Sequence, residues 1–142
     1  MTDKPDFGRL MAGVIPYITV NGAEKAAEFY KKAFGAVQHN PAAKTPDGRV
    51  LNITLEINGG VLMLVDPFPE MDPATKPTGA MMLIVTLEGD LWWDRAVAEG
   101  CIIKDPIRKE FWGDRYGRLE DPYGVSWAIN EPGAENLAAS RN

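Results

Sequence analysis

The chain has 142 residues, of which 45% are hydrophobic and 25% charged, a composition typical of one folded globular domain. Its net charge of −5 argues against binding to nucleic acid or to an anionic membrane surface, because both need a basic footprint. No apolar run is long enough to span a membrane, residues 1–9 lack the apolar core of a signal peptide, and the lone Cys101 cannot form an internal disulfide, so we expect a cytoplasmic protein.

The first half of the chain predicts a strand, a helix and three further strands. Residues 14–20 are short and β-branched, as in a strand, and the apolar side chains after them recur at helical spacing up to Gly35. Asn21 is the predicted cap of this helix. A short strand is expected at residues 36–40 and a turn at 45–48. Residues 51–57 alternate strictly between apolar and polar, which predicts a strand with one dry face, and Asn58-Gly59 predicts a tight turn into an apolar strand at 61–65.

The second half repeats this order of elements at an offset of 65 residues, without a gap. Because glycine marks places where the chain must turn, matching glycines indicate one supersecondary unit used twice. The second copy is expected to contain a strand at 80–86, a helix from Asp90 to residue 98, a short strand at 101–104, and strands at 115–120 and 125–130. The offset sets Glu56 opposite Asp121, and the matching glycines are Gly35 with Gly100, Gly48 with Gly113, and Gly59 with Gly124.

These elements predict an α+β fold of two tandem βαβββ modules, each a cupped mixed sheet backed by a helix. We expect an N-terminal extension at 1–12, one domain at 13–132, and a frayed C-terminal tail at 133–142. Within the domain, module one covers about 13–67, a proline-rich linker about 68–79, and module two about 80–132. Because each helix covers the apolar face of its sheet, the concave faces are left to line a cup.

Two such copies resemble the vicinal oxygen chelate superfamily, which includes glyoxalase I, bleomycin-resistance proteins and extradiol dioxygenases, and more narrowly its PhnB-like branch. The resemblance covers about residues 13–132. It implies the glyoxalase/bleomycin resistance fold, a small organic molecule as ligand, and a homodimer. The stretches that carry it are Ile15-Pro16-Tyr17 with Glu28-Phe29-Tyr30 and Phe34-Gly35-Ala36, then residues 111–117, then Asp121-Pro122-Tyr123-Gly124 with Trp127.

In the enzymes of that superfamily, the resemblance implies a divalent metal held by the first and last strands of each module. Here those strands offer residues 15–18 and Met63 in copy one, and residues 80–83 and Ala128 in copy two. None supplies the imidazole, carboxylate or thiolate that Zn²⁺, Ni²⁺ or Fe²⁺ prefers. The single His39 has no histidine partner and is interpreted as a surface or edge residue. We therefore predict no metal and no cofactor.

The densest polar and aromatic cluster of the sequence is Asp114-Arg115-Tyr116. In one interpretation Arg115 binds an anionic or carbonyl group at the rim of the cup, and Tyr116 or Trp112 stacks on the ligand. In the other, Asp114 and Arg115 form a hydrogen-bonded turn at the start of the strand and Trp112 fills the core.

Polar residues on the strand at 51–57 are the second candidate group. Asn52 and Thr54 could orient a ligand, and Glu56 could act as a general base if it were buried, or the three could form a solvated face. Met63 and Leu83 would make the cup apolar and adaptable, or simply fill the core.

The leading hypothesis is a metal-free protein that binds a small, partly apolar organic molecule for sequestration or sensing. Its rival is a glyoxalase-like lyase, isomerase or dioxygenase-type enzyme with a non-standard site, in which Glu56 or Glu110 is the acid/base group. A third possibility is a non-catalytic interaction module. The ligand-binding residues that the first hypothesis predicts are Tyr17, Asn52, Thr54, Met63, Leu83, Trp112, Arg115 and Tyr116.

Overall fold

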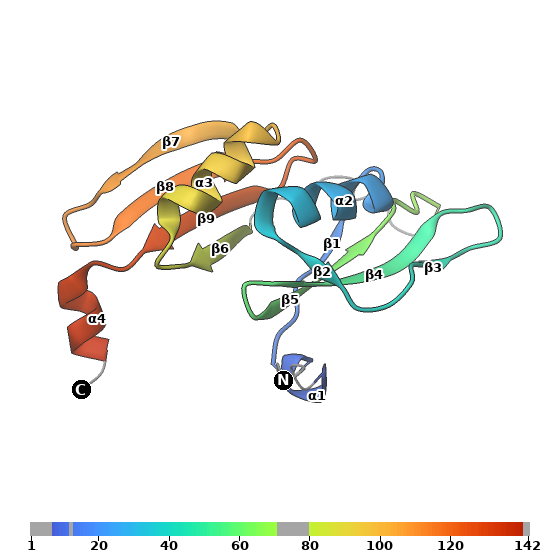
Figure 1. Ribbon diagram of the computed structural model, residues 1–142. Helices are drawn as coiled ribbons and strands as arrows, with labels where there is room; N and C mark the ends of the chain where they lie inside the picture. The colour runs from blue at the N-terminus through green and yellow to red at the C-terminus, as the bar shows by residue number, and fades with distance from the viewer. Residues whose placement is uncertain (1–6, 12, 71–79, 141–142) are drawn as a thin grey trace. The chain divides into compact units, whose positions relative to one another are not determined.

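The computed structural model describes residues 7–11, 13–70 and 80–140, and residues 71–79 of the expected linker lie outside them. The chain forms two compact units. Unit 1 comprises residues 1–31 and 35–76, and unit 2 comprises residues 32–34 and 77–142. Each unit contains one mixed sheet, and the order of elements confirms the predicted α+β fold of two βαβββ modules (Figure 1). Within the described residues, none of the helices has both the length and the apolar character needed to cross a membrane.

Unit 1 is built around a sheet in the order β1-β5-β4-β2, with β3 paired to β4. β1 runs parallel to β5, while β4 is antiparallel to β5, β2 and β3. The short β3 is absent from the prediction, and α1 lies in the expected N-terminal extension. The elements are α1 (Phe7–Leu10), β1 (Tyr17–Thr19), α2 (Ala23–Phe34), β2 (Val37–Gln38), β3 (Ala43–Lys44), β4 (Val50–Ile57) and β5 (Gly60–Val65).

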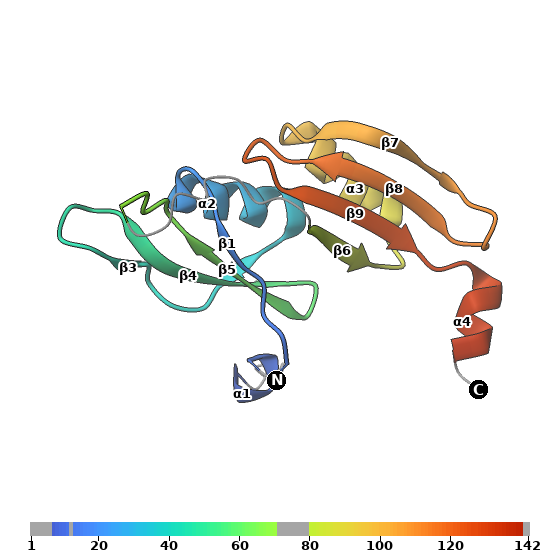
Figure 2. The ribbon, with the colours of Figure 1, turned by 180° about the vertical axis from the view of Figure 1, so that it is seen from behind.

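In unit 1, α2 covers one face of the sheet (Figure 2), and the buried side chains of the core lie between them. Alternate residues of β4 and β5 are buried on that face, as the alternation in the sequence predicts, and α2 presents small side chains and Tyr30 to them. The two strands are joined by Asn58 and Gly59, whose φ angles of 52° and 78° are both positive, as a tight hairpin turn requires. The buried strand residues are Ile53, Leu55, Leu62 and Leu64.

The start of α2 is capped from a distance. Gly22 occupies the N-cap position and makes no side-chain cap, so the prediction that Asn21 caps this helix was wrong. Instead, Asp66, which follows β5, accepts the backbone N–H of Ala23 at 2.8 Å through Oδ1 and that of Val50 at 2.7 Å through Oδ2. One carboxylate therefore joins the helix start to two strands. Gly35 ends the helix in the left-handed conformation, as predicted.

Unit 2 contains a four-stranded sheet in the order β6-β9-β8-β7, in which β6 and β9 are parallel. β7 is twice as long as the expected short strand, and residues 134–140 of the expected frayed tail form a helix. The core on the α3 side includes Trp93, Leu119, Trp127 and Ile129. The elements are β6 (Met81–Val85), α3 (Gly89–Ala98), β7 (Ile102–Lys109), β8 (Arg115–Glu120), β9 (Ser126–Glu131) and α4 (Ala134–Ser140).

The cap of α3 repeats that of α2. Glu131 at the end of β9 accepts the backbone N–H of Gly89 at 3.0 Å, and it lies 65 residues after Asp66. Asp90, the predicted cap, lies one residue inside the helix and instead pairs with Arg115. Both modules thus fix the start of their helix with a carboxylate at the end of their last strand.

The repeat is not free of gaps, which corrects the sequence prediction. Glu56 pairs across its hairpin with Val61, whereas Ser126, at the position 65 residues later, pairs with Glu120. The structural counterpart of Glu56 is therefore Glu120 and not Asp121. The reason is that four residues separate Glu56 from its partner Val61, whereas five separate Glu120 from its partner Ser126.

Candidate functional site

The face of the unit 1 sheet that points away from α2, here called the helix-free face, collects most of the predicted polar residues. Residues that are paired on adjacent strands lie side by side, so the strand pairing shows which of these residues are neighbours on the face. The backbone of His39 bonds to Thr54, Thr54 pairs with Met63, and Met63 pairs with Tyr17. Three strand positions and His39, which follows β2, therefore form one row across this face.

A chain of hydrogen bonds organises the polar side chains on this face. The Thr54 hydroxyl donates to Oδ1 of Asn52 at 3.0 Å, and Nδ2 of Asn52 donates to the Tyr17 hydroxyl at 3.1 Å. The Tyr17 hydroxyl donates in turn to the carbonyl of Leu51 at 2.6 Å. Tyr17 nevertheless remains 51% exposed. The structure thus brings together Tyr17, Asn52, Thr54 and Met63, four of the predicted ligand-binding residues, in a pre-oriented array.

The same face holds an imidazole–carboxylate pair that sequence analysis missed. Nε2 of His39 lies 3.0 Å from Oε2 of Glu56, and the two side chains are 21% and 19% exposed. Val37 pairs with Glu56, so His39, two residues further on, lies on the same face as Glu56. Continuing the alternation of the short strand by two residues was the signal that could have found this pair.

The corresponding face of the unit 2 sheet mixes apolar and aromatic side chains with charged ones, which include Arg118 and Glu120. The Tyr116 hydroxyl donates to the sulfur of Met81 at 3.8 Å, and the rings of Trp112 and Tyr116 meet edge to face with centroids 5.8 Å apart. Leu83 is exposed on β6, next to Ala128 of β9. Trp112 is 42% exposed, so it does not fill the core as one interpretation of the sequence had it.

Arg115 lies on the other side of that sheet. Its guanidinium donates to Oδ1 of Asp90, in the first turn of α3, at 2.7 Å and to Glu131 at 3.3 Å. The hydrogen bond from Arg115 holds the pKa of Asp90 below its usual value, and that from Asp90 raises the pKa of Arg115. Arg115 thus ties β8 to the start of α3, and its predicted contact with a ligand stays a prediction.

Asp114 and Glu110 lie in the turn before β8 and contact neighbouring chain segments. Asp114 accepts hydrogen bonds from the side chains of Asn136 and Asn130 and from the backbone of Gly133, and these bonds lower its pKa. Glu110 accepts a hydrogen bond from Arg108 at 3.2 Å. Asp114 and Arg115 thus take separate partners rather than forming the single turn considered above.

The residues present do not fit the metal that the fold family implies. The facing positions of the first and last strands are Tyr17 with Met63 in unit 1 and Leu83 with Ala128 in unit 2. A phenol, a thioether and two alkyl groups are not the donor set of a divalent transition metal. Within residues 7–11, 13–70 and 80–140, no cluster of three or more His, Cys, Asp or Glu side chains could hold a metal ion.

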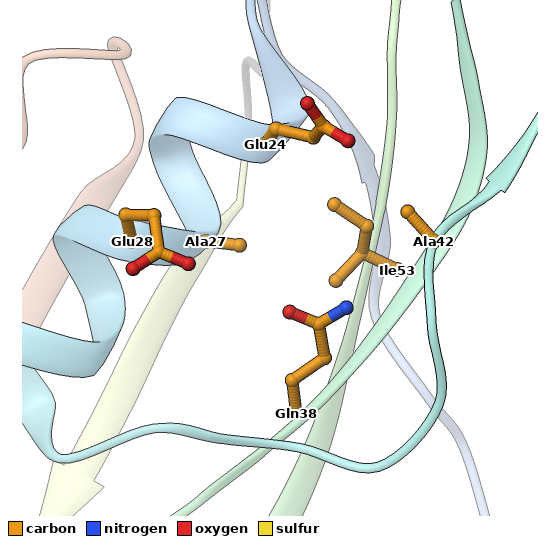
Figure 3. A pocket seen from close by; sticks show the side chains of 6 residues that line it. All are labelled: Glu24, Ala27, Glu28, Gln38, Ala42 and Ile53. Carbon is orange, nitrogen blue, oxygen red and sulfur yellow. The ribbon is translucent and has the colours of Figure 1, made fainter.

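A separate pocket of about 230 Å³ lies on the α2 side of the unit 1 sheet (Figure 3). Glu24 and Glu28 of α2 face Gln38 and Ile53 across it. Both carboxylates have cationic partners, because Glu24 pairs with Lys44 and Glu28 with Lys31. The pocket was not predicted from the sequence. Its two carboxylates are paired with lysines, and Ile53 forms an apolar part of its lining.

Cys101 is not a nucleophile of either face. The residue is only 7% exposed. Burial, the larger cause, and the negative charge of Asp121, the smaller one, raise the pKa of its thiol to about 12. Because the thiolate is the reactive form, we expect a disulfide reagent at pH 8 to modify Cys101 at least ~100-fold more slowly in the folded protein than in urea. Absorbance of the released thiol measures both rates, and similar rates would contradict the assignment.

Comparison with known proteins places these features in a family context. A model of the Glyoxalase/Bleomycin resistance protein/Dioxygenase superfamily matches residues 9–129. An uncharacterized protein of Mycobacterium bovis is 34% identical over 124 residues, which cover 82% of this chain and 81% of that protein.

Solved structures share the fold. A putative 3-demethylubiquinone-9 3-methyltransferase, PhnB protein, from Bacillus cereus matches with a TM-score of 0.68 and 21% identity, covering 83% of this chain and 98% of its own. A lactoylglutathione lyase from Agrobacterium tumefaciens matches with a TM-score of 0.60 and 20% identity, covering 90% of this chain and 96% of its own. At these identities the likeness concerns the fold alone. The resemblance predicted from the sequence is confirmed.

Proposed function

This chain belongs to the glyoxalase/bleomycin resistance protein/dioxygenase superfamily, and on that basis we propose that it binds a small, partly apolar organic molecule without a metal ion. The proposed site is the helix-free face of unit 1. The observation that carries it is the hydrogen-bonded chain from Thr54 through Asn52 to Tyr17, which lies beside Met63. Sequestration or sensing of the molecule would require only that the protein binds it, without a catalytic step.

The composition of this face suits such a ligand. Fixed polar groups among apolar side chains are typical of small-molecule sites, because the polar atoms orient the ligand and the apolar ones supply contact area. Tyr17 combines both roles, since its exposed ring can stack while its hydroxyl stays bonded to Leu51. Met63 adds an adaptable thioether next to that ring.

An enzyme is the second candidate, and one observation favours it. The His39–Glu56 pair joins an imidazole to a carboxylate, two side-chain types that commonly serve as general acid or base in enzymes. On this alternative, a bound carbonyl compound would exchange a carbon-bound proton with solvent. Incubation in deuterated buffer and mass spectrometry distinguish the two functions, because a binder leaves its ligand unlabelled.

Replacing Tyr17 with alanine tests the site directly. We expect affinity for any ligand found by screening aromatic metabolites to fall at least ~10-fold, because the variant loses both the stacking ring and the anchor of the Asn52 side chain. Calorimetry or ligand-detected NMR is the appropriate measurement. Tryptophan quenching is unsuitable here because all four tryptophans lie in the sequence range of unit 2.

The matched control is Tyr116→Ala in unit 2, which removes an aromatic ring from the other sheet and should leave the affinity unchanged. Addition of EDTA should also have no effect. Equal losses in both tyrosine variants, or loss of binding with the chelator, would contradict the proposed site.

A further inference from the structure

Glu56 is the one carboxylate on the helix-free face among the described strand residues of unit 1, and it pairs with His39. Beside the sheet, Glu24 of α2 pairs with Lys44 of β3, and Glu28 pairs with Lys31 within α2. No lysine or arginine on the described strands therefore offers a partner to an anionic ligand on this face.

Glu56 is flanked by apolar neighbours. Val37 pairs with it on one side and Val61 on the other, and Val37 is 56% exposed. The bond to His39 uses Oε2, and among the described residues no donor reaches Oε1. A carboxylate oxygen with capacity to accept a hydrogen bond thus lies between two valines, on the face that also carries Met63.

From this arrangement we propose that the site is selective for cationic amines, meaning molecules with a protonated amine next to an apolar body. The amine donates to Oε1 of Glu56, and the apolar body lies over Val37, Val61 and Met63. A charge-assisted hydrogen bond is stronger than a neutral one, which gives the amine its advantage over an alcohol of the same shape. This inference rests on the proposed function, whose ligand class it specifies.

Unit 2 supplies an internal control. Glu120, the counterpart of Glu56, lies 3.8 Å from the side-chain nitrogen of Lys104. This carboxylate is also more exposed than that of Glu56. Because a lysine stands beside it in place of a histidine, we expect that Glu120 does not favour a cationic ligand.

The test uses 1-naphthylmethylamine, 1-naphthalenemethanol and 1-naphthoic acid, which share one ring system and differ in charge. Calorimetry at pH 7.5 should give an affinity for the amine about tenfold above that for the alcohol, with the acid weakest. Glu56→Gln should reduce the affinity for the amine to that for the alcohol, whereas Glu120→Gln should preserve the difference. The ring protons of His39, the only histidine, report binding by NMR in untagged protein.

The outcomes separate the two proposals. If the alcohol or the acid binds as tightly as the amine, or if Glu56→Gln keeps the preference, the inference is overturned while ligand binding stands. If none of the three binds at millimolar concentration, the proposed function is contradicted and the inference with it.

Discussion

Gly117→Ala should destabilise the protein by at least ~3 kcal/mol, because the new methyl group has no space. A Cβ at this position would lie 2.6 Å from Cζ3 of Trp93 and 2.8 Å from the Cα and N atoms of Ile107. Trp93 is a buried residue of α3, and Ile107 belongs to β7, which is paired to β8. To make space for the methyl group, α3 would have to shift or the pairing between β7 and β8 would have to break.

Urea unfolding followed by tryptophan fluorescence measures this effect. Gly60→Ala is the matched control, since its Cβ would come no closer than 3.7 Å to the carbonyl of Ile57, an ordinary contact. We expect the control to change the free energy of unfolding by less than ~1 kcal/mol. If the two alanine variants were equally stable, the close packing of Gly117 against α3 would be wrong.

Asp121→Ala should be comparably damaging, by about 3 kcal/mol or more, because it leaves buried donors without their acceptor. The carboxylate is buried and accepts the backbone N–H groups of Tyr123 and Val125 at 2.8 and 3.0 Å. It also accepts the indole N–H of Trp127 at 2.8 Å. These three bonds fix the longer connection between β8 and β9 and orient a core tryptophan.

Thermal unfolding by circular dichroism measures the loss. Asp105→Ala is the control, because Asp105 pairs with Arg118 on an exposed part of the surface and such pairs contribute little. We expect the control to unfold within about 2 °C of the unchanged protein and Asp121→Ala to unfold at least ~8 °C lower. Equal melting temperatures would show that the Asp121 bonds do not hold this connection.

The features that the sequence predicted correctly depend on local rules. Turns at Gly35 and Asn58-Gly59 follow from glycine's tolerance of positive φ, and the dry face of β4 follows from strict alternation. The array of Tyr17, Asn52, Thr54 and Met63 could be anticipated in part because Asn52 and Thr54 belong to a strand whose alternation was evident. The family resemblance then set these strands side by side.

The features that were missed depend on contacts between distant residues. Helix caps were sought within a few positions of each helix start, but Asp66 and Glu131 lie 43 and 42 residues from the amides that they accept. The His39–Glu56 pair joins β4 to the residue that follows β2, and the alternation of that short strand gave the face of His39 but not its partner. Arg115 shares its side of β8 with Gly117 and Leu119, so the alternation of that strand already indicated a direction toward α3.

The distant caps also bear on how the chain folds during its synthesis. While β5 is still within the ribosome, the first amide of α2 lacks the carboxylate of Asp66 that stabilises it in the finished protein. The same holds for α3 until Glu131 emerges. A partly synthesised module therefore has an incompletely capped helix, and each module reaches its full stability only when its last residues are released. Because the two caps are made within separate modules, the cap of α2 can form before the second half of the chain exists.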